Sequence, residues 1–474
     1  MSDLELRRSG DVRYEIPPTG DMRVPGVVFA SEALLPDDDG GTLRQVANVA
    51  TLRGIVQGSY AMPDLHLGYG FAIGAVAATD VEDGGVVSPG GVGFDISCGV
   101  RVLVAPLSQE EAGQRGLDTL MDELDRTIPR GTGPGGIWQV DDDQVRRLLV
   151  EGSAYAVKAG YGTEDDLGYT EDRGRLTDAD PDAVSDKALQ RGLKQVGSLG
   201  SGNHFLEVQA VDRVADAKTA EAFGVQDDQL VVTIHCGSRG LGHQVCTDHV
   251  RAMHSAMERH GVSVPDKQLA SVPVRSPEGQ AYLGAMAAAA NYGRANRQVL
   301  AEAARDAFGK AFGSRALRLL YDVSHNMAKL EDHDVGGRRR RLCVHRKGAT
   351  LALPPGHADL PAAFRDSGQP VAVPGSMGTA SWLLAGTGGE AFASTCHGAG
   401  RAKSRAGAKK QVWGETLRDE LEAKGIAVRA LSDAGLAEEA PVAYKDVDEV
   451  VRVCERAGVS RRVARLRPVG VVKG

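Results

Sequence analysis

The segment from Gly90 to Arg101, GGVGFDISCGVR, places an aspartate and a cysteine three residues apart among glycines. Glycine lets a backbone turn tightly and approach a ligand closely, and a carboxylate and a thiol on one turn can face the same ion. An isolated pair of this kind is more often a turn aspartate followed by a buried cysteine. Asp95 and Cys98 therefore become candidate metal ligands only when other ligands accompany them.

Four histidines lie in similarly polar surroundings that are rich in glycine or contain asparagine. They are His204 in GSGNHFLE, His235 in TIHCGSRG, His325 in YDVSHN and His397 in STCHGAGR. Histidine is the commonest metal ligand, and loops at strand ends often carry functional groups. A single histidine of this kind is usually a hydrogen-bonded core or surface residue, but four together favour a site.

Spacing alone does not select the ligands among the 12 histidines of the chain. The rival candidates are His66, His243, His249, His254 and His260. The last four follow His235 at offsets that partly suit one face of a helix. Ligand identity therefore needs information beyond spacing.

Two further segments are typical of phosphate binding. Pro374 to Thr379, PGSMGT, can offer backbone N–H groups to an anion, and HGAGRAKSR follows His397 with Arg401, Lys403 and Arg405. A plain turn and a solvated basic surface explain these segments equally well. The run Arg338 to Arg341 is typical of a solvated hairpin tip, although it could touch nucleic acid. The nucleotide motifs GxxxxGK[ST] and GxGxxG in a strand-to-helix setting are absent.

Both strands and helices are predicted to position these groups. The run Val231 to Ile234 predicts a buried strand that ends at His235, and residues 108–128 have the apolar spacing of a helix. Residues 276–312 are rich in alanine and predict one or two long helices, whereas YDVSHN and the segment after it predict strands around a Gly-Gly turn. The expected class is mixed α and β.

Length and charge limit the possible functions. The 474 residues can form one large domain or two to three ordinary ones, and the net charge of −8 argues against binding to nucleic acid by overall charge alone. An anionic substrate would need a focused site. The six cysteines lack zinc-finger or disulfide spacing, and no run approaches the roughly 18 apolar residues of a membrane span, so we expect a cytoplasmic protein.

Taken together, ten ordered motifs resemble the RtcB family of RNA ligases. The motifs are PDLHLGYG, GGVGFDISCGVR, GSLGSGNHFLE, HCGSRGLGHQ, NYGRANRQ, VSHNMAK, HRKGAT, PGSMGT, STCHGAGR and VVKG. The match runs from about Val24 to the C-terminus. The resemblance implies an α+β fold in a single domain over residues 1–474, with a central two-metal site. The acidic segment 163–186 is the least motif-like part and is expected to be an exposed excursion.

The resemblance also implies a reaction. The family joins RNA ends that bear a 3′-phosphate or 2′,3′-cyclic phosphate to 5′-hydroxyl ends, using GTP and manganese, in tRNA splicing or RNA repair. It would proceed through a histidine-guanylate intermediate and a guanylylated RNA 3′-end. The partners implied are RNA and GTP, and an activating protein partner stays open.

Site residues carry over position by position. Cys98 would bridge two Mn²⁺ ions, with His204 and His235 completing one site and Asp95 and His325 the other, while His397 would carry guanylate. Guanylate-binding positions would be Asn203, His204, Phe205, Leu206, Glu207, His325, Asn326, Pro374, Gly375, Ser376, Met377, Ser381, His397, Gly398, Ala399, Gly400 and Lys473. RNA phosphates would contact Arg191, Arg239, Lys347, Arg401 and Arg405.

Two observations stand against a simple reading of this resemblance. Thiolate and imidazole ligands by themselves suggest zinc rather than the harder Mn²⁺. The assignment of manganese therefore rests on the resemblance alone. Ala402-Lys403 stands where apolar residues are expected.

Two other functions are weighed beside the ligase. A binuclear metallohydrolase acting on cyclic phosphates or phosphodiesters would use the same cluster without GTP or a histidine nucleophile. A non-enzymatic RNA-binding protein is disfavoured by the acidic charge and by an aromatic content of only 5%.

Overall fold

Two large β-sheets, covered by helices, make up the fold in the computed structural model, which describes residues 4–133 and 135–474. The first sheet has the order β1-β2-β3-β4-β5-β13-β12. Its strands are β1 (Arg7–Arg8), β2 (Arg13–Ile16), β3 (Gly26–Phe29), β4 (Ile55–His66), β5 (Ile73–Asp80), β12 (Asn326–Val335) and β13 (Arg338–Lys347). Neighbours are antiparallel except β3 and β4, which helix α1 (Gly41–Val49) connects in parallel.

The second sheet carries most of the candidate site. Its order is β11-β7-β9-β8-β19-β16-β15, and a further strand lies parallel to β19. The strands are β7 (Gly99–Ser108), β8 (Phe205–Val214), β9 (Gln229–Cys236), β11 (Arg318–Ser324), β15 (Pro370–Val373), β16 (Ser381–Gly386), β18 (Ala427–Ala430) and β19 (Ser460–Lys473). Two short pairs complete the strands: β6 (Val86–Val87) with β10 (Val272–Pro273), and β14 (Ala349–Leu351) with β17 (Ser394–Cys396).

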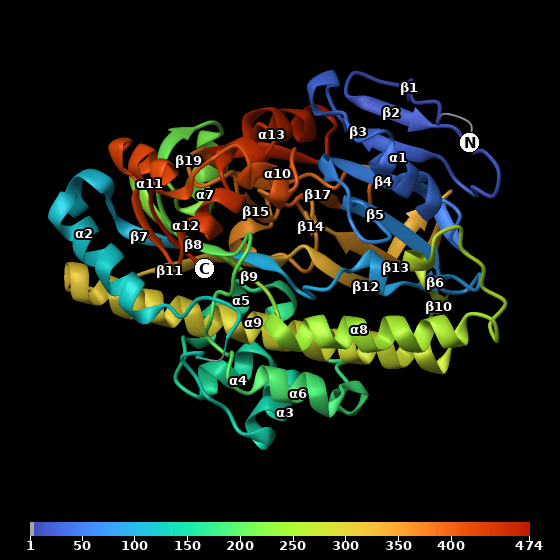
Figure 1. Cartoon of the computed structure of the whole chain (residues 1–474), viewed down its shortest axis with the longest axis horizontal. Coiled ribbons are helices and arrows are strands. Elements are labelled where there is room, and N and C mark those ends of the chain that lie inside the picture. Colours follow the sequence, from blue (N-terminus) through green and yellow to red (C-terminus); the bar gives the residue numbers. More distant parts are fainter. Residues whose placement is uncertain (1–3, 134) are drawn as a thin grey trace.

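The longest helix, α9 (Pro277–Phe312), runs along one side of the sheets with α8 (Arg239–Ala256) beside it (Figure 1). Ser276 caps the start of α9 by accepting a hydrogen bond from the Gly279 amide, Pro277 occupies its first turn, and Gly313 ends it in the left-handed conformation. Helices α3 (Asp142–Glu151) and α4 (Ser153–Lys158) pack on α9. The others are α2 (Gln109–Thr127), α5 (Glu164–Gly168), α6 (Asp186–Gly192), α7 (Ala217–Phe223), α10 (Arg405–Lys409), α11 (Gly414–Ala423), α12 (Asp433–Glu438) and α13 (Val447–Arg456).

The structure confirms the expected mixed class and most of the expected elements. The predicted helix over 108–128 is α2, and the alanine-rich segment forms the single helix α9. The β-branched run lies in β9, which continues one residue past His235. Gly336 and Gly337 make the predicted turn between β12 and β13. Each large sheet combines strands from distant parts of the sequence. We therefore propose that the chain forms a single domain.

Most residues of the acidic segment 163–186 are exposed or partly exposed, but two of its acidic side chains are not. Asp166 and Glu171 are buried, and their carboxylates pair with the guanidinium groups of Arg305 and Arg294 on α9 at 2.6 and 3.2 Å. A buried carboxylate needs such a partner, and the sequence of the segment alone does not contain it. Within the described residues, no helix has the length and apolar character needed to cross a membrane.

Candidate metal centre and nucleotide pocket

The candidate metal ligands meet because antiparallel strands alternate in direction. Cys98 immediately precedes β7, His235 lies at the end of β9, and His325 follows the end of β11. Gly99 at the start of β7 pairs with Cys236 on one side and Ser324 on the other. The start of one strand therefore lies beside the ends of its two neighbours, and all three side chains reach the same end of the sheet.

Two more strands bring residues to the same end of this sheet. Phe205, the first residue of β8, pairs with His235 in β9 and with Lys473 at the end of β19. His204, which precedes β8, is thereby placed beside His235, and their ring centroids are 5.6 Å apart. The sequence motifs near residues 98, 204, 235, 325 and 473 thus form one region.

A tight turn carries Asp95 and Cys98. The Cys98 amide donates to the Asp95 carbonyl oxygen at 3.1 Å, and Ser97 within the turn has a φ of 57°, in the left-handed region. A side chain at the next residue, Gly99, would place its Cβ 2.5 Å from the Val323 carbonyl oxygen. Glycine is needed there because the strand β11 passes too close for any side chain.

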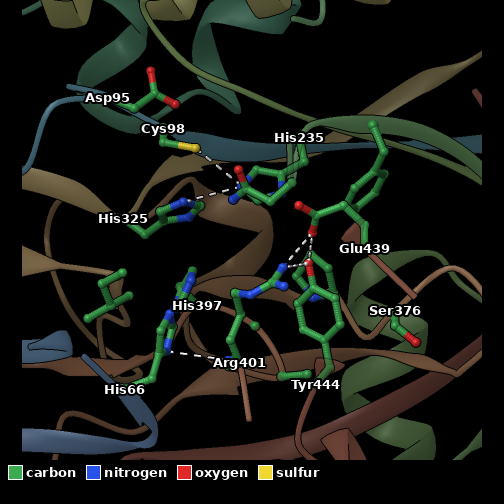
Figure 2. A pocket seen from close by; sticks show the side chains of 18 of the residues that line it. His66, Asp95, Cys98, His235, His325, Ser376, His397, Arg401, Glu439 and Tyr444 are labelled. Atoms are coloured by element: carbon green, nitrogen blue, oxygen red, sulfur yellow. Dashed lines mark hydrogen bonds and ion pairs between the residues drawn. The ribbon is translucent and has the colours of Figure 1, made fainter. Parts of the chain in front are cut away.

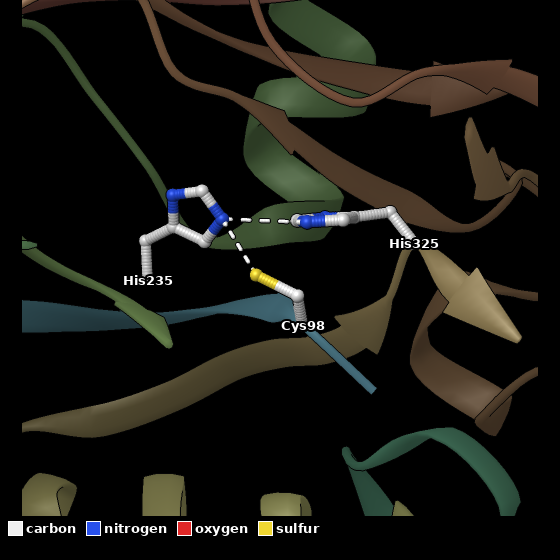
Figure 3. Close-up of side chains that lie close together, drawn as sticks. All are labelled: Cys98, His235 and His325. Atoms are coloured by element: carbon white, nitrogen blue, oxygen red, sulfur yellow. Dashed lines mark hydrogen bonds between the residues drawn. The ribbon is translucent and has the colours of Figure 1, made fainter. Parts of the chain in front are cut away.

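Five ligand atoms converge in two groups that share the Cys98 thiol. In one group, the Cys98 Sγ lies 3.3 Å from His235 Nε2, which lies 3.3 Å from His325 Nε2 (Figure 3). In the other, Cys98 Sγ lies 3.4 Å from His204 Nε2, which lies 2.8 Å from Asp95 Oδ2. Within each group the ligand atoms lie within 4.8 Å of one another.

The ligand atoms of the free side chains are grouped differently from the expected metal sites, which joined His204 with His235 and Asp95 with His325, and that expected assignment stays a prediction. The difference follows from the sheet register. His235 lies in β9 and His325 directly follows β11, the two strands that flank β7, whereas His204 and Asp95 lie on loops outside the sheet. A shared thiol was expected, and Cys98 belongs to both groups of ligand atoms in the structure.

The donor set fits divalent metal ions. Burial raises the pKa of the Cys98 thiol and lowers the pKa values of His235 and His325, because a low-dielectric site disfavours charged forms. Neutral imidazoles are the form that binds metal, and a thiolate in such a site needs a cation beside it. His204 Nδ1 donates to the Leu199 carbonyl oxygen at 3.0 Å, which leaves Nε2 free to face Asp95 and Cys98.

Arg297 on helix α9 contacts the segments that carry the candidate metal ligands. Arg297 donates to the carbonyl oxygens of Ser97 and Cys236 at 2.7 and 2.9 Å, and its guanidinium pairs with Asp322 on β11 at 2.8 Å. All of these groups are buried. One arginine therefore joins the backbone before Cys98, the residue after His235 and the strand that leads to His325.

His397 directly follows β17, and Asp64 of β4 orients it. Asp64 Oδ2 accepts hydrogen bonds from His397 Nδ1 at 2.6 Å, from the His397 amide at 3.0 Å and from the Gly398 amide at 3.3 Å. Burial alone would raise the pKa of Asp64, but the charge and the hydrogen bonds of His397 lower it. Nδ1 thus keeps its proton, and the other nitrogen of the ring is free to act as a nucleophile.

His397 is also close to the metal cluster. Its ring centroid lies 4.9 Å from that of His325. Asp64 was missed by the sequence reasoning because its partner lies 333 residues away. Asp64 lies within the motif PDLHLGYG, but nothing in this motif identifies the aspartate as the partner of His397.

A cavity of about 330 Å³ connects His397 with the metal cluster (Figure 2). Most of the expected guanylate positions line it: Asn203, Phe205, Glu207, His325, Asn326, Pro374, Gly375, Ser376, Met377, His397, Gly398, Ala399, Gly400 and Lys473. Three of the expected positions do not. Leu206 is buried in the core, Ser381 is buried and accepts from the Gly375 amide at 3.2 Å, and His204 faces a second cavity.

Two buried ionisable residues, the acid Glu207 and the base Lys473, line this cavity. Burial raises the pKa of Glu207 to about 8 and lowers the pKa of Lys473 to about 8. The Lys473 ammonium donates to the carbonyl oxygens of Gly202 and His204 at 2.5 and 3.2 Å. Hydrogen-bonding groups of this kind, fixed by backbone contacts, suit the polar edge of a nucleobase.

The rim of the cavity contains residues that sequence reasoning did not assign. Arg401 donates to Glu439 at 3.0 Å and lies with its guanidinium carbon 5.1 Å from the centre of the Tyr444 ring. Arg405 donates to the other oxygen of Glu439 at 3.1 Å. Arg401 and Arg405, which were expected to contact RNA phosphates, thus line this cavity, and Glu439 and Tyr444 hold them in place.

A second cavity of about 640 Å³ adjoins the first at Asp95 and Asn203. Arg191 and Arg239 line it, so the expected RNA contacts are divided between the two cavities. Lys347 lines the first cavity, although it is buried, and its ammonium donates to the carbonyl oxygens of Tyr69 and Phe71. Burial lowers the pKa of Lys347 to about 7.

The rival histidines have other environments. His66 Nδ1 contacts the Asp64 carbonyl oxygen at 2.9 Å, His249 contacts the Ala183 carbonyl oxygen at 3.2 Å, and His260 contacts Glu278 at 2.9 Å. His254 is exposed on α8. The ring of His243 stacks on Phe94. The groups of converging ligand atoms found in the described part of the chain contain none of these five residues.

Comparison with known proteins points in one direction. A sequence model of the family described as "tRNA-splicing ligase RtcB" matches residues 45–474. The "RNA-splicing ligase RtcB" of Mycobacterium tuberculosis is 60% identical over 432 residues, which cover 91% of this chain and 100% of that protein. The "tRNA-splicing ligase RtcB" proteins of Thermococcus kodakarensis and Archaeoglobus fulgidus are 51% and 50% identical, each covering 99% of both chains.

Proposed function

The chain belongs to the RtcB family of RNA ligases, and we propose that it joins an RNA 3′-phosphate or 2′,3′-cyclic phosphate end to a 5′-hydroxyl end by way of a guanylate carried on His397. The reaction uses GTP and serves tRNA splicing or RNA repair in the cytoplasm. The chain is a ligase that acts on RNA ends, and the intermediate, the nucleotide and the metal are the proposed parts.

Two Mn²⁺ ions are the proposed metals. Asp95, Cys98 and His204 would hold one ion, and Cys98, His235 and His325 the other. When bound, such ions offset negative charge on phosphate oxygens and on leaving groups. The thiolate and imidazole donors would also suit zinc, so the metal has to be identified by metal analysis of the purified protein.

The first step is guanylylation of His397. The His397 Nε2 lone pair attacks the α-phosphorus of GTP, the new N–P bond forms, and pyrophosphate leaves. Asp64 keeps the Nδ1 proton in place and balances the positive charge that develops on the ring. Glu207 and Lys473, with the loop Pro374–Met377, supply the polar groups of the proposed guanine and phosphate pocket.

The next two steps transfer guanylate and then seal the RNA. An oxygen of the RNA 3′-phosphate attacks the phosphorus of the His397 adduct, which breaks the N–P bond and restores the histidine. The 5′-hydroxyl oxygen then attacks the activated 3′-phosphate, its proton is lost to solvent, and GMP leaves. A cyclic phosphate end has first to be opened by water to a 3′-phosphate.

Basic residues around both cavities would bind the RNA. Arg401 and Arg405 at the rim of the first cavity, Lys347 in its wall, and Arg191 and Arg239 in the second cavity could contact phosphates on either side of the reacting ends. These basic residues provide local positive charge in the cavities, although the net charge of the whole protein is −8. An activating protein partner is a further part of this proposal.

One observation supports this reaction over a metallohydrolase. His397 lies in the same cavity as the metal ligands, and a buried aspartate fixes its proton on Nδ1. A hydrolase that activates water on two metals has no use for an oriented histidine nucleophile.

Labelling with nucleotide tests the proposal. The protein is incubated with Mn²⁺ and GTP labelled at the α-phosphate, denatured and separated by electrophoresis. We expect an acid-labile, base-stable label on the wild type and on His254→Ala, a control at an exposed position of α8, but not on His397→Ala. An unlabelled wild type loaded with metal would refute the ligase mechanism, and a phosphodiesterase activity that survives in His397→Ala would favour the hydrolase.

A further inference from the structure

Three aromatic rings form a continuous row between the two cavities. The rings of Tyr69 and Phe94 meet edge to face with centroids 5.2 Å apart, and the rings of Phe94 and His243 stack with centroids 4.9 Å apart and planes at 29°. Tyr69 and Phe94 line the first cavity, and His243 lines the second. We call this row of three residues the aromatic ledge.

The ledge is adjacent to the metal cluster but takes no part in it. Phe94 directly precedes Asp95, and His243 is absent from the groups of converging ligand atoms in the described residues. Phe94 and Tyr69 are partly exposed and His243 is exposed. Aromatic surface that stays open in a cavity of an RNA ligase has the chemistry of a platform for bases.

The ledge is held rigidly in the fold. The side-chain amide of Gln45 clamps Gly68 by donating to its carbonyl oxygen at 2.6 Å and accepting from its amide at 3.0 Å. Gln268 accepts from the Gly70 amide at 2.9 Å on the other side of Tyr69. The backbone of His243 belongs to helix α8, and its ring packs on Phe94. A preformed surface loses little freedom when a base stacks on it, which favours binding.

The surroundings of the ledge suit a nucleotide rather than an apolar ligand. The second cavity, beside His243, is lined by the cations Arg191, Lys194 and Arg239, and Asp95 is the one carboxylate among its described lining residues. The first cavity leads from Tyr69 and Phe94 to His397. A nucleotide whose base lies on the ledge can thus direct one phosphate towards His397 while the chain behind it follows the basic cavity.

We propose that the aromatic ledge stacks the base of the 3′-terminal nucleotide of the RNA and so directs its 3′-phosphate towards His397. The 3′-end is the occupant we assign because its phosphate must enter the first cavity to take guanylate, and Tyr69 and Phe94 of the ledge line that cavity. The proposal rests on the proposed function, because it names the part of the RNA that this same site holds.

The experiment follows transfer of guanylate in a single turnover. Protein that already carries labelled guanylate is mixed with an RNA that ends in a 3′-phosphate, and the rate is divided by the guanylylation rate of the same variant. Two RNAs are compared, one with an ordinary terminal base and one whose terminal nucleotide has no base. The variants are His243→Ala, His243→Phe and Phe94→Leu, with His254→Ala on α8 as the control.

Loss of stacking on one base, about 1 to 3 kcal/mol, corresponds to a slower transfer rate by about 5- to 150-fold. We expect the wild type and His254→Ala to transfer guanylate more slowly to the abasic RNA by a factor in this range. We expect His243→Ala and Phe94→Leu to be slow with both RNAs, and His243→Phe, which keeps a flat ring, to retain the preference for the RNA with a base.

Three results would overturn the proposal. If wild type and His243→Ala lose the same factor on the abasic RNA, the base does not lie on the ledge. If only the sealing of an RNA that is already activated at its 3′-end is slowed, the ledge binds the 5′-end instead. Absence of guanylylation in the wild type would refute the proposed function itself, and the ledge with it.

Discussion

The replacement Asp64→Asn tests how much the nucleophile depends on its buried partner. Asp64 has 0% of its surface exposed, and its Oδ2 atom accepts all three hydrogen bonds that the group receives from His397 and Gly398. Its other oxygen, Oδ1, has no partner among the described residues. Asparagine can keep its oxygen at the position of Oδ2 and place its amide where Oδ1 lies. The variant therefore keeps the shape and the Nδ1 proton of His397, and it loses only the negative charge.

The size of the effect follows from that charge. Positive charge develops on the His397 ring when Nε2 attacks phosphorus, and two unit charges about 4 Å apart in a partly polarisable site interact by about 4 kcal/mol. Since about 1.4 kcal/mol corresponds to a tenfold change in rate, we expect guanylylation to slow by about 10³-fold. The free energy of unfolding should fall by about 1 to 3 kcal/mol, because the asparagine amide is buried where Oδ1 has no partner in the described part of the chain.

A rapid-quench assay measures this rate directly. Metal-loaded protein is mixed with GTP labelled at the α-phosphate, and labelled protein is counted over time in wild type, Asp64→Asn and Asp64→Ala. Asp64→Ala should be slower still, because the ring orientation is lost as well. Thermal unfolding of the same samples checks that the variants are folded. A guanylylation rate for Asp64→Asn within about threefold of the wild type would refute the electrostatic role of Asp64.

Three further changes probe the cluster, the loop of the nucleophile and a buried ion pair. Cys98→Ala removes the ligand shared by both groups, so bound metal measured by mass spectrometry should fall from two ions towards none; retention of both ions would contradict the shared-ligand geometry. Gly400→Ala would place a Cβ 2.2 Å from the Asp64 carbonyl oxygen, so we expect it to lower the midpoint of thermal unfolding and slow guanylylation, and a wild-type rate would contradict this close approach. Burial alone would raise the pKa of Asp166, but Arg305 and neighbouring groups lower it to about 2, so its stabilisation of about 2 kcal/mol is present above pH 4 and lost as the pH falls towards 2. Urea unfolding at pH 6 and pH 3 should show a smaller loss of stability in Asp166→Asn than in the wild type, and equal losses would count against the pair.

The sequence identified which residues belong to the site more easily than how they are arranged. The polar residues set among glycines at Asp95, Cys98 and His397 stand out because a core residue seldom has such neighbours. Their grouping into two sites depends on the register of β7, β9 and β11, which no local pattern encodes. The resemblance to a family indicated the candidate ligands, and the register of the sheet determines which of them lie together.

Long-range partners were beyond the sequence reasoning for the same reason. Asp64 in β4 contacts His397 after β17, and Arg297 joins three strands from a helix that the sequence predicted without indicating this contact. The acidic segment around Asp166 looked solvated because its cations lie on α9, far along the chain. Local composition predicts elements well, but a buried polar group is explained only by its distant partner.

The convergence of strands at the metal cluster also has a consequence for the order of folding. The three adjacent strands β7, β9 and β11 begin at residues 99, 229 and 318, so the contacts that bring their ligands together close loops of roughly a hundred residues. Closing such loops is slow, and no short fragment of the chain contains a complete ligand set. A metal ion therefore cannot nucleate this fold in the way it does in a zinc finger. The chain has to acquire its sheets first and load metal afterwards, through the cavities, and bound metal then stabilises the finished protein by mass action.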